Sequence, residues 1–191
     1  MTAGHVFERV LAALEASGIS CMLTGSFASS YHGAPRATQD IDLVIEPTPE
    51  QVLAFVGLLP REEYYVDKGA ALEAVRHEGQ FNVIDLRTGW KVDLIIRKSR
   101  PFSREEFRRK APAKVEGVEV LVATPEDLLI AKMEWARMGQ SARQIEDAAK
   151  MLRVRSDQVD RQYVERWVQE LRLEAQWSEV QRVAGVASND Q

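Results

Sequence analysis

The most informative segment of the sequence is Leu23–Glu46, LTGSFASSYHGAPRATQDIDLVIE. A Gly-Ser pair follows an apolar strand pattern, and thirteen residues separate it from a second strand that carries Asp40 and Asp42. Because side chains alternate along a strand, both carboxylates point to one face, and Ile41, Leu43 and Ile45 point to the other. Their separation would be roughly 7 Å, two residues at ~3.3 Å each.

Two carboxylates at this spacing repel each other unless a cation lies between them, and a divalent metal prefers oxygen ligands. Taken alone, Asp-x-Asp usually means an exposed strand with a polar face. Three further features favour a site. Gly25 and Ser26 open a helical pattern whose N–H groups and hydroxyl can face a phosphate. Asp93 lies in the apolar strand pattern WKVDLII, where a carboxylate needs a metal or a partner. The third feature is the spacing of thirteen residues.

Length and composition set the protein class. The 191 residues suffice for one domain, or for a compact domain with a helical appendage. Hydrophobic residues make up 45% and charged residues 28%, and no apolar run approaches the ~20 residues of a membrane span, so we expect a soluble protein without a membrane partner. The N-terminus lacks the features of a secretory signal, which predicts a cytoplasmic location. Cys21, the single cysteine, is expected to be a buried structural thiol rather than a nucleophile.

The charge distribution limits the role of nucleic acid. A net charge of -4 and a pI near 5.5 argue against a surface that grips nucleic acid as a whole. The basic stretch from Arg97 to Lys110 leaves two interpretations equally open, a phosphate-facing patch and a solvated helix.

Hydrophobic periodicity divides the chain near Ala123. Strand patterns occur at residues 19–24, 41–45, 81–86, 91–96 and 118–122, and helical patterns at 6–14, 26–33 and 49–60. After Val122 only helical patterns follow, at residues 124–139, 141–154, 163–173 and 174–183. We predict an α/β (α+β) fold in which residues 1–123 form a mixed-sheet core. Residues 124–191 are predicted to form a C-terminal helical region that packs on this core, with a frayed tail at 185–191.

The Gly-Ser pair, the DIDL strand and the later aspartate together resemble the signature of the DNA polymerase beta-type nucleotidyltransferase superfamily. Within it, the chain is similar to small prokaryotic members of the abortive-infection (AbiEii-like) toxin branch. The resemblance extends to YHGAPRATQDIDLVI, to TPEDLLIAKMEWARMG and to the helical patterns after Ser141, so that it covers Leu23 to Trp177. It implies a nucleotidyltransferase core.

The resemblance also implies roles for individual residues. Asp40 and Asp42 match the acids that hold a metal ion, normally Mg²⁺ with Mn²⁺ as a substitute. Asp93 matches the third acid, which completes the metal site and helps to deprotonate the acceptor. Gly25 and Ser26 match the turn that contacts the triphosphate.

The implied activity is the transfer of a nucleoside monophosphate from ATP or another NTP to an acceptor hydroxyl, with release of pyrophosphate. A tRNA, a protein or a small molecule would suit this chemistry as the acceptor. A toxin of this kind would have a cognate antitoxin as its partner. The alternative is a catalytically inactive member that serves as a binding or regulatory module.

Lys132 is a further candidate because it lies at the middle of an apolar helix face, among Leu128, Ala131, Trp135 and Ala136. Two interpretations remain open: the lysine binds the triphosphate, as the resemblance implies, or it extends from an apolar groove to solvent.

Other polar residues are weaker candidates for nucleotide binding. Asp147 lies on the polar side of its helix, where an ion pair with Arg143 explains it as well as a supporting site role. Arg36 and Thr38 precede the acidic strand and can contact phosphate, although an arginine in a turn is ordinary. Lys91 flanks Asp93, and contact with the acceptor and a solvated edge are both open. Three tryptophans are expected in the core: Trp135, Trp167 and Trp177.

Overall fold

The computed structural model describes residues 3–186, and its contacts divide the chain into two units. The sheet unit comprises the residues up to Phe27 together with Ala37–Ala123. The helical unit comprises Ala28–Arg36 and the residues from Thr124 onward. From residue 187 the predicted frayed tail lies outside the described residues, and the predicted domains 1–123 and 124–191 stay a prediction.

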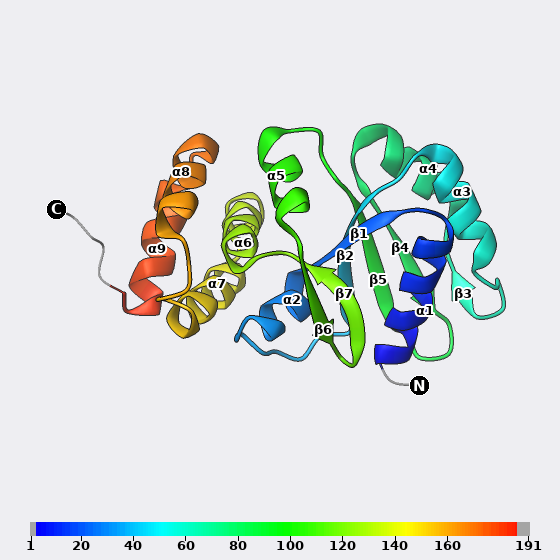
Figure 1. The fold of residues 1–191 in the computed structure, drawn as a ribbon, viewed down its shortest axis with the longest axis horizontal. Helices are drawn as coiled ribbons and strands as arrows, with labels where there is room; N and C mark the ends of the chain where they lie inside the picture. The colour runs from blue at the N-terminus through cyan, green and yellow to red at the C-terminus, as the bar shows by residue number, and fades with distance from the viewer. Residues whose placement is uncertain (1–2, 187–191) are drawn as a thin grey trace. The chain divides into compact units, whose positions relative to one another are not determined.

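The sheet unit is a mixed seven-stranded sheet with helices (Figure 1). Its strands are β1 (Ser20–Thr24), β2 (Asp40–Glu46), β3 (Tyr64–Tyr65), β4 (Gln80–Asp85), β5 (Lys91–Ile96), β6 (Ala111–Val115) and β7 (Val118–Val122). Its helices are α1 (Ala3–Ala16), α3 (Pro49–Leu58), α4 (Lys68–His77) and α5 (Pro101–Arg109), and α2 (Gly25–Tyr31) crosses from one unit to the other. The strand order is β3-β4-β5-β2-β1-β7-β6, with β2–β5 and β1–β7 parallel. The predicted α/β fold class with a mixed sheet is confirmed.

The two faces of the sheet differ in chemistry. The first is apolar, and its fully buried side chains include Leu23, Ile41, Leu43, Ile45, Val92 and Leu94. Phe55 of α3 packs on this face against Phe81 of β4, with ring centroids 6.5 Å apart, and α1 and α4 both contact α3. The second face is apolar only in part, where Phe107 of α5 packs with Met22, Val44 and Ala123. The acidic side chains of β2 and β5 lie on this second face.

Local signals account for most elements. Thr48 caps α3 with a full capping box, and Pro49 opens the helix. Hydrophobic periodicity does not predict β3, β6 or α4. β3 has only two residues, β6 contains Pro112, and α4 carries Gly69 in its first turn, so none of them shows a clear period.

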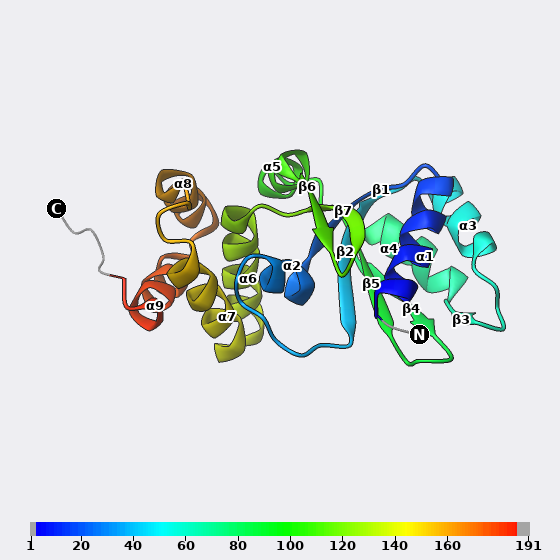
Figure 2. The same cartoon turned by 60° about the horizontal axis from the view of Figure 1, so that its bottom comes forward.

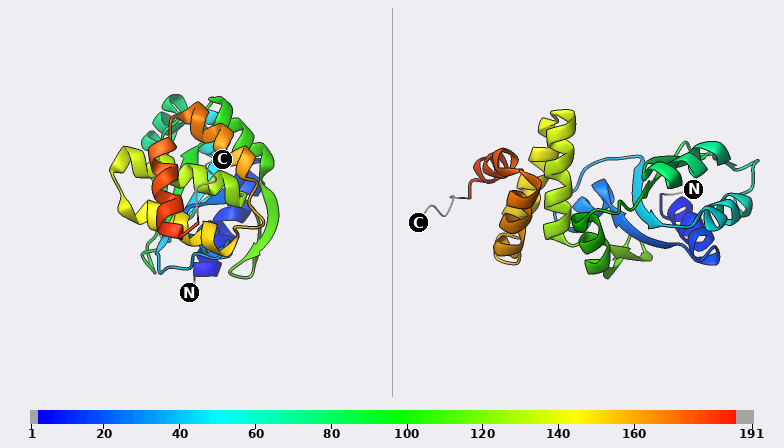
Figure 3. Two further views of the ribbon diagram at one scale, coloured as in Figure 1. Left: turned by 90° about the vertical axis from the view of Figure 1, so that its left-hand side faces the viewer. Right: turned by 90° about the horizontal axis from the view of Figure 1, so that it is seen from above.

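The helical unit contains α6 (Pro125–Gly139), α7 (Ala142–Val154), α8 (Arg161–Leu171) and α9 (Glu174–Ala184), shown in Figures 2 and 3. As predicted, no strand follows Val122 within residues 3–186. Trp167 and Trp177 are buried as expected, whereas the expectation for Trp135 is wrong because its side chain is 49% exposed. Met133 and Ala136 on the same helix are buried, so the buried stripe of α6 lies beside the position of Trp135 and does not include it.

None of the helices in the described part of the chain has the length and apolar character needed to cross a membrane.

Candidate functional site

Three carboxylates and one ammonium form a compact group on the second face of the sheet, here called the acid cluster: Asp40, Asp42, Asp93 and Lys91. Asp42 is the register partner of Asp93 across the parallel strands β2 and β5, and Asp40 is the partner of Lys91. Register partners and residues two apart share a face, so all four side chains point the same way. The expected common face of Asp40 and Asp42 is therefore present, with Asp93 beside them.

Lys91 neutralises part of this cluster. Its Nζ lies 2.8 Å from Oδ2 of Asp93 and 3.5 Å from Oδ1 of Asp40. The hydrogen bond from Lys91 to Asp93 raises the pKa of the lysine, with further contributions from the negative charges of both aspartates. Lys91 thus has two carboxylate partners while its side chain stays 36% exposed, and its contact with the acceptor stays a prediction.

Asp42 of the acid cluster has a raised pKa. Burial raises the pKa of its carboxyl to about 6, and the negative charges of Asp93 and Asp40 act in the same direction. A hydrogen bond from the backbone N–H of Ser26 and the charge of Lys91 only partly oppose this rise. Keeping Asp42 ionised therefore costs free energy. Such carboxylates are typical of functional sites, where a bound cation offsets the cost of burial and repulsion.

The Gly-Ser turn is pressed against Asp42. Gly25 has a φ of +63°, and a Cβ atom there would lie 2.5 Å from Cγ and 2.8 Å from Cβ of Asp42. Ser26 is 3% exposed, and its backbone N–H donates to the Asp42 carboxylate. The turn and the acidic strand are thus one structural feature, which explains why the sequence needs glycine at this position.

We expect Gly25→Ala to destabilise the protein by about 1–3 kcal/mol, because alanine is strained at positive φ and its methyl group displaces the Asp42 side chain. Urea denaturation of the metal-free protein measures the effect. Gly57→Ala is the matched control, since a Cβ at Gly57 meets no atom within 4 Å and Gly57 lies inside a helix. Equal stability of the Gly25→Ala variant and the parent would contradict the close packing of turn and strand.

The donor set of the acid cluster fits a hard divalent cation. Three carboxylates supply only oxygen ligands, which Mg²⁺ and Mn²⁺ accept. In residues 3–186 no group of three or more His, Cys, Asp or Glu side chains is already arranged to hold a metal ion. The acid cluster has instead an ammonium, that of Lys91, between the carboxylates of Asp40 and Asp93.

Two polar neighbours of the acid cluster were not predicted from the sequence. Thr24 of β1 is the register partner of Asp42, and Asn82 of β4 is the register partner of Asp93. Together the four residues form a polar row across four strands. Thr24 precedes the Gly-Ser pair directly, but only the strand register could have identified Asn82. Thr38 lies two residues before β2, and its hydroxyl accepts a hydrogen bond of 3.2 Å from the backbone N–H of Asp40.

The helical unit holds a second group of charges, here called the lysine cluster. Lys132 is 4% exposed, and its Nζ lies 3.2 Å from Oδ2 of Asp147 and 3.3 Å from Oε1 of Gln144. Arg36 approaches the same carboxylate, with its Nε 3.4 Å from Oδ2 of Asp147. The interpretation of Lys132 as a lysine that reaches solvent is therefore wrong.

Asp147 requires a correction. It is buried with 4% exposure, so the surface ion pair with Arg143, one of the two interpretations that the sequence left open, is wrong. Its partners come from α6 and from the loop after α2, segments that a helical wheel of α7 does not include. The structure thus brings together Lys132, Asp147 and Arg36, three of the residues predicted to bind nucleotide. It does not test that role.

The basic stretch from Arg97 to Lys110 is largely engaged in local contacts. Arg97 forms an ion pair with Glu46, Arg108 lies 2.7 Å from Glu105, and the ammonium of Lys110 lies 3.4 Å from the ring centroid of Phe107. These contacts favour the solvated helix over a phosphate-facing patch.

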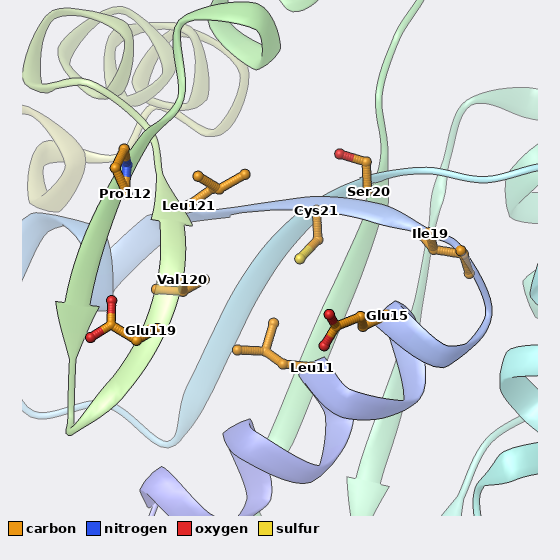
Figure 4. A pocket seen from close by; sticks show the side chains of 10 residues that line it. Leu11, Glu15, Ile19, Ser20, Cys21, Pro112, Glu119, Val120 and Leu121 are labelled. Carbon is orange, nitrogen blue, oxygen red and sulfur yellow. The ribbon is translucent and has the colours of Figure 1, made fainter.

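A cavity of about 590 Å³ lies elsewhere in the sheet unit, lined by residues of α1, β1, β6 and β7 (Figure 4). β1 and β7 pair only at Leu23 and Val122, so the two strands separate beside Cys21. The thiol is half-buried, and burial raises its pKa to about 11. This agrees with the expectation that Cys21 is no nucleophile.

We expect Cys21 to react slowly with thiol reagents. With a pKa of about 11, only about one thiol in a thousand is ionised at pH 8, against roughly one in four for an ordinary cysteine. Labelling of the native protein with iodoacetamide at pH 8 should be at least about a hundredfold slower than in 6 M urea. Equal rates in the two conditions would contradict the burial of the thiol.

Three solved structures share the fold. The antibiotic-resistance factor ANT(2'')-Ia in solution has 15% identity and a TM-score of 0.50, with 92% of this chain and 94% of that chain covered. ANT(2'')-Ia in complex with adenylyl-2''-tobramycin has 12% identity and a TM-score of 0.53, with 93% and 96% covered. An antigenic nucleotidyltransferase-like protein from Paracoccidioides brasiliensis has 16% identity and a TM-score of 0.52, with 92% and 91% covered. At these identities the likeness shows the fold alone.

Comparison with curated proteins found no match. The sequence model of one family, described as "Nucleotidyl transferase AbiEii toxin, Type IV TA system", matches residues 9–184. This match includes the Gly-Ser turn, the acid cluster and the lysine cluster. The chain therefore belongs to the AbiEii toxin family of nucleotidyl transferases from type IV toxin–antitoxin systems.

Proposed function

We propose that the protein transfers a nucleoside monophosphate from an NTP to an acceptor hydroxyl, and that the acid cluster carries the reaction. The observation that carries the proposal is the register pair Asp42–Asp93, with Asp40 two residues along the same face and the Gly-Ser turn against Asp42. This arrangement gathers three oxygen donors and the start of a helix in one place, which suits a metal-bound triphosphate.

We propose Asp40, Asp42 and Asp93 as the ligands of a divalent cation, Mg²⁺ or Mn²⁺. When bound, the cation would neutralise charge on the triphosphate and on the oxygens that attack and leave. The role of the backbone at Gly25 and Ser26 is to orient the phosphates. The Asp93 carboxylate would accept the proton of the acceptor hydroxyl as its oxygen bonds to the α-phosphorus. The bond from the α-phosphorus to the bridging oxygen breaks, and pyrophosphate leaves.

For the remaining candidates the proposal depends on the family. Lys132 and Arg36 would bind phosphate oxygens, Asp147 would hold both cations in place, and Thr38 would fix the start of the acidic strand. ATP is the first NTP to test.

The acceptor and the partner follow from the same reasoning. A tRNA, a protein and a small molecule each offer a suitable hydroxyl, and the adenylylated tobramycin bound to ANT(2'')-Ia is an example of the small-molecule class. Since the family belongs to toxin–antitoxin systems, we propose a cognate antitoxin as the physiological partner.

A transfer assay tests the function directly. Purified protein is incubated with Mg²⁺ or Mn²⁺, with each α-³²P-labelled NTP in turn, and with total RNA, cell lysate protein or an aminoglycoside mixture. The proposal expects label in one acceptor class with at least one NTP and release of pyrophosphate. Absence of label in every mixture would contradict the proposal and support the inactive binding module.

A further inference from the structure

The position of Lys91 within the acid cluster carries an inference that rests on the proposed function. The lysine is the first residue of β5, and its ammonium bridges two of the three carboxylates, at 2.8 Å from Asp93 and 3.5 Å from Asp40. The Asp93 side chain is 13% exposed and that of Asp40 50%, so water screens the contact of Lys91 with Asp93 less than its contact with Asp40. The three carboxylates therefore already have one cation, and that cation belongs to the chain.

We propose that Lys91 is an internal counter-ion that a divalent cation must displace from the acid cluster, and that Lys91 thereby weakens metal binding by the free enzyme. An ammonium and a metal ion cannot both hold the same carboxylate oxygens at close range, because two cations there repel each other. Displacement also frees the ammonium, since its four-carbon stem allows it to move while the strand stays in place. In this state it can approach the phosphates or the acceptor.

Lys91 is a positioning residue under this proposal. Without metal it keeps Asp40 and Asp93 from repelling each other and stabilises the face of the sheet. With metal it becomes an available cation beside the reacting groups. Without metal, the enzyme thus stays folded with Lys91 as the counter-ion of the acid cluster. The fraction of enzyme that holds a divalent cation then depends on the concentration of that cation.

Lys91→Met tests the competition because methionine keeps the stem and removes the charge. Binding of Mn²⁺ is measured by calorimetry in the absence of nucleotide. We expect Lys91→Met to bind Mn²⁺ about tenfold more tightly than the parent. This factor is near the lower end of the range of about 5- to 150-fold by which one bound group typically changes the affinity for another. We also expect a lower melting temperature without metal, because the carboxylates then lack their counter-ion, and a larger rise in melting temperature on adding Mn²⁺.

Two controls separate charge from position. Lys114→Met removes an exposed lysine of β6 and lowers the net charge equally, so its Mn²⁺ affinity should equal that of the parent. Lys91→Arg keeps the charge and should not bind Mn²⁺ more tightly. Equal or weaker affinity in Lys91→Met would overturn the inference, even if the parent transfers nucleotide normally.

A measurement on the unaltered protein guards against a misfolded variant. Acylation of lysine amines, read by mass spectrometry, should label Lys91 faster with Mn²⁺ than with EDTA, while the labelling rate of Lys114 stays constant. Unchanged labelling of Lys91 at saturating Mn²⁺ would overturn the displacement. If neither the parent nor any variant binds Mn²⁺, both this inference and the metal assignment are overturned. Failure of the Lys91 inference alone leaves Mn²⁺ binding by the parent intact, so the two failures can be told apart.

Discussion

Asp42→Asn should abolish nucleotidyl transfer, with a loss of about 1,000-fold or more in kcat/KM. Asparagine keeps the shape of the side chain and can still accept the hydrogen bond from Ser26, but it removes a charge that faces the metal. A loss of this size corresponds to ~4 kcal/mol of transition-state stabilisation, within the range expected when a metal is no longer held in place. The rate of label transfer to the identified acceptor measures it.

The same substitution should stabilise the metal-free protein in a pH-dependent way. At a pH well below 3.8 the carboxyl of Asp42 is protonated in both folded and unfolded chains, and asparagine then has no advantage. As the pH rises, the unfolded chain ionises first, because folding raises the pKa of Asp42 from 3.8 to about 6. Above pH 6 the folded parent therefore carries a penalty of about 2–3 kcal/mol that Asp42→Asn lacks.

Urea denaturation in EDTA at pH 4 and pH 7.5 checks this sign. The quantity compared is the gain in the free energy of unfolding of Asp42→Asn over the parent. This gain should be about 2 kcal/mol larger at pH 7.5 than at pH 4. Asp157→Asn, at an exposed position, should match the parent in activity and in stability at both values of pH. Full activity of Asp42→Asn with Mg²⁺ would contradict the metal assignment, whereas a pH-independent difference would contradict only the electrostatic account.

The acid cluster could be predicted well from sequence because its determinants are local. Alternation along β2 places Asp40 and Asp42 on one face, and the apolar context of Asp93 identifies a carboxylate in need of a partner. The register of β2 with β5 is not local. It could not be derived from the residues, and it is the register that sets Asp42 opposite Asp93 and adds Lys91, Thr24 and Asn82 to the same face.

Helical periodicity fails in the lysine cluster for a related reason. A helical wheel describes one helix, whereas burial depends on what packs against it. Asp147 has a polar position within α7, yet Lys132 of α6 and Arg36 of the loop after α2 approach it and exclude water. Trp135 shows the opposite error: the helical wheel of α6 predicts that it is buried, yet it is 49% exposed.

This difference reverses one expectation for Lys132→Met. From sequence alone, an ammonium on an apolar helix face lacks an anion, so methionine should leave the fold at least as stable. The structure supplies the anion: Lys132 and Asp147 form a pair whose side chains are each only 5% exposed. Removing Lys132 leaves a buried carboxylate that keeps the ion pair with Arg36. We therefore expect the free energy of unfolding to fall by about 2–4 kcal/mol, measured by urea denaturation.

A double variant separates the structural role of Lys132 from nucleotide binding. Lys132→Met combined with Asp147→Leu removes both charges and should recover at least half of the lost stability, because no unpaired carboxylate remains. Lys150→Met, at an exposed position of α7, is the control and should change neither stability nor affinity. If Lys132 binds phosphate, the double variant should still bind NTP more weakly than the parent by about 1–3 kcal/mol in calorimetry. Recovery of parental NTP affinity together with stability would show that Lys132 only holds the helices together, and would remove it from the nucleotide site.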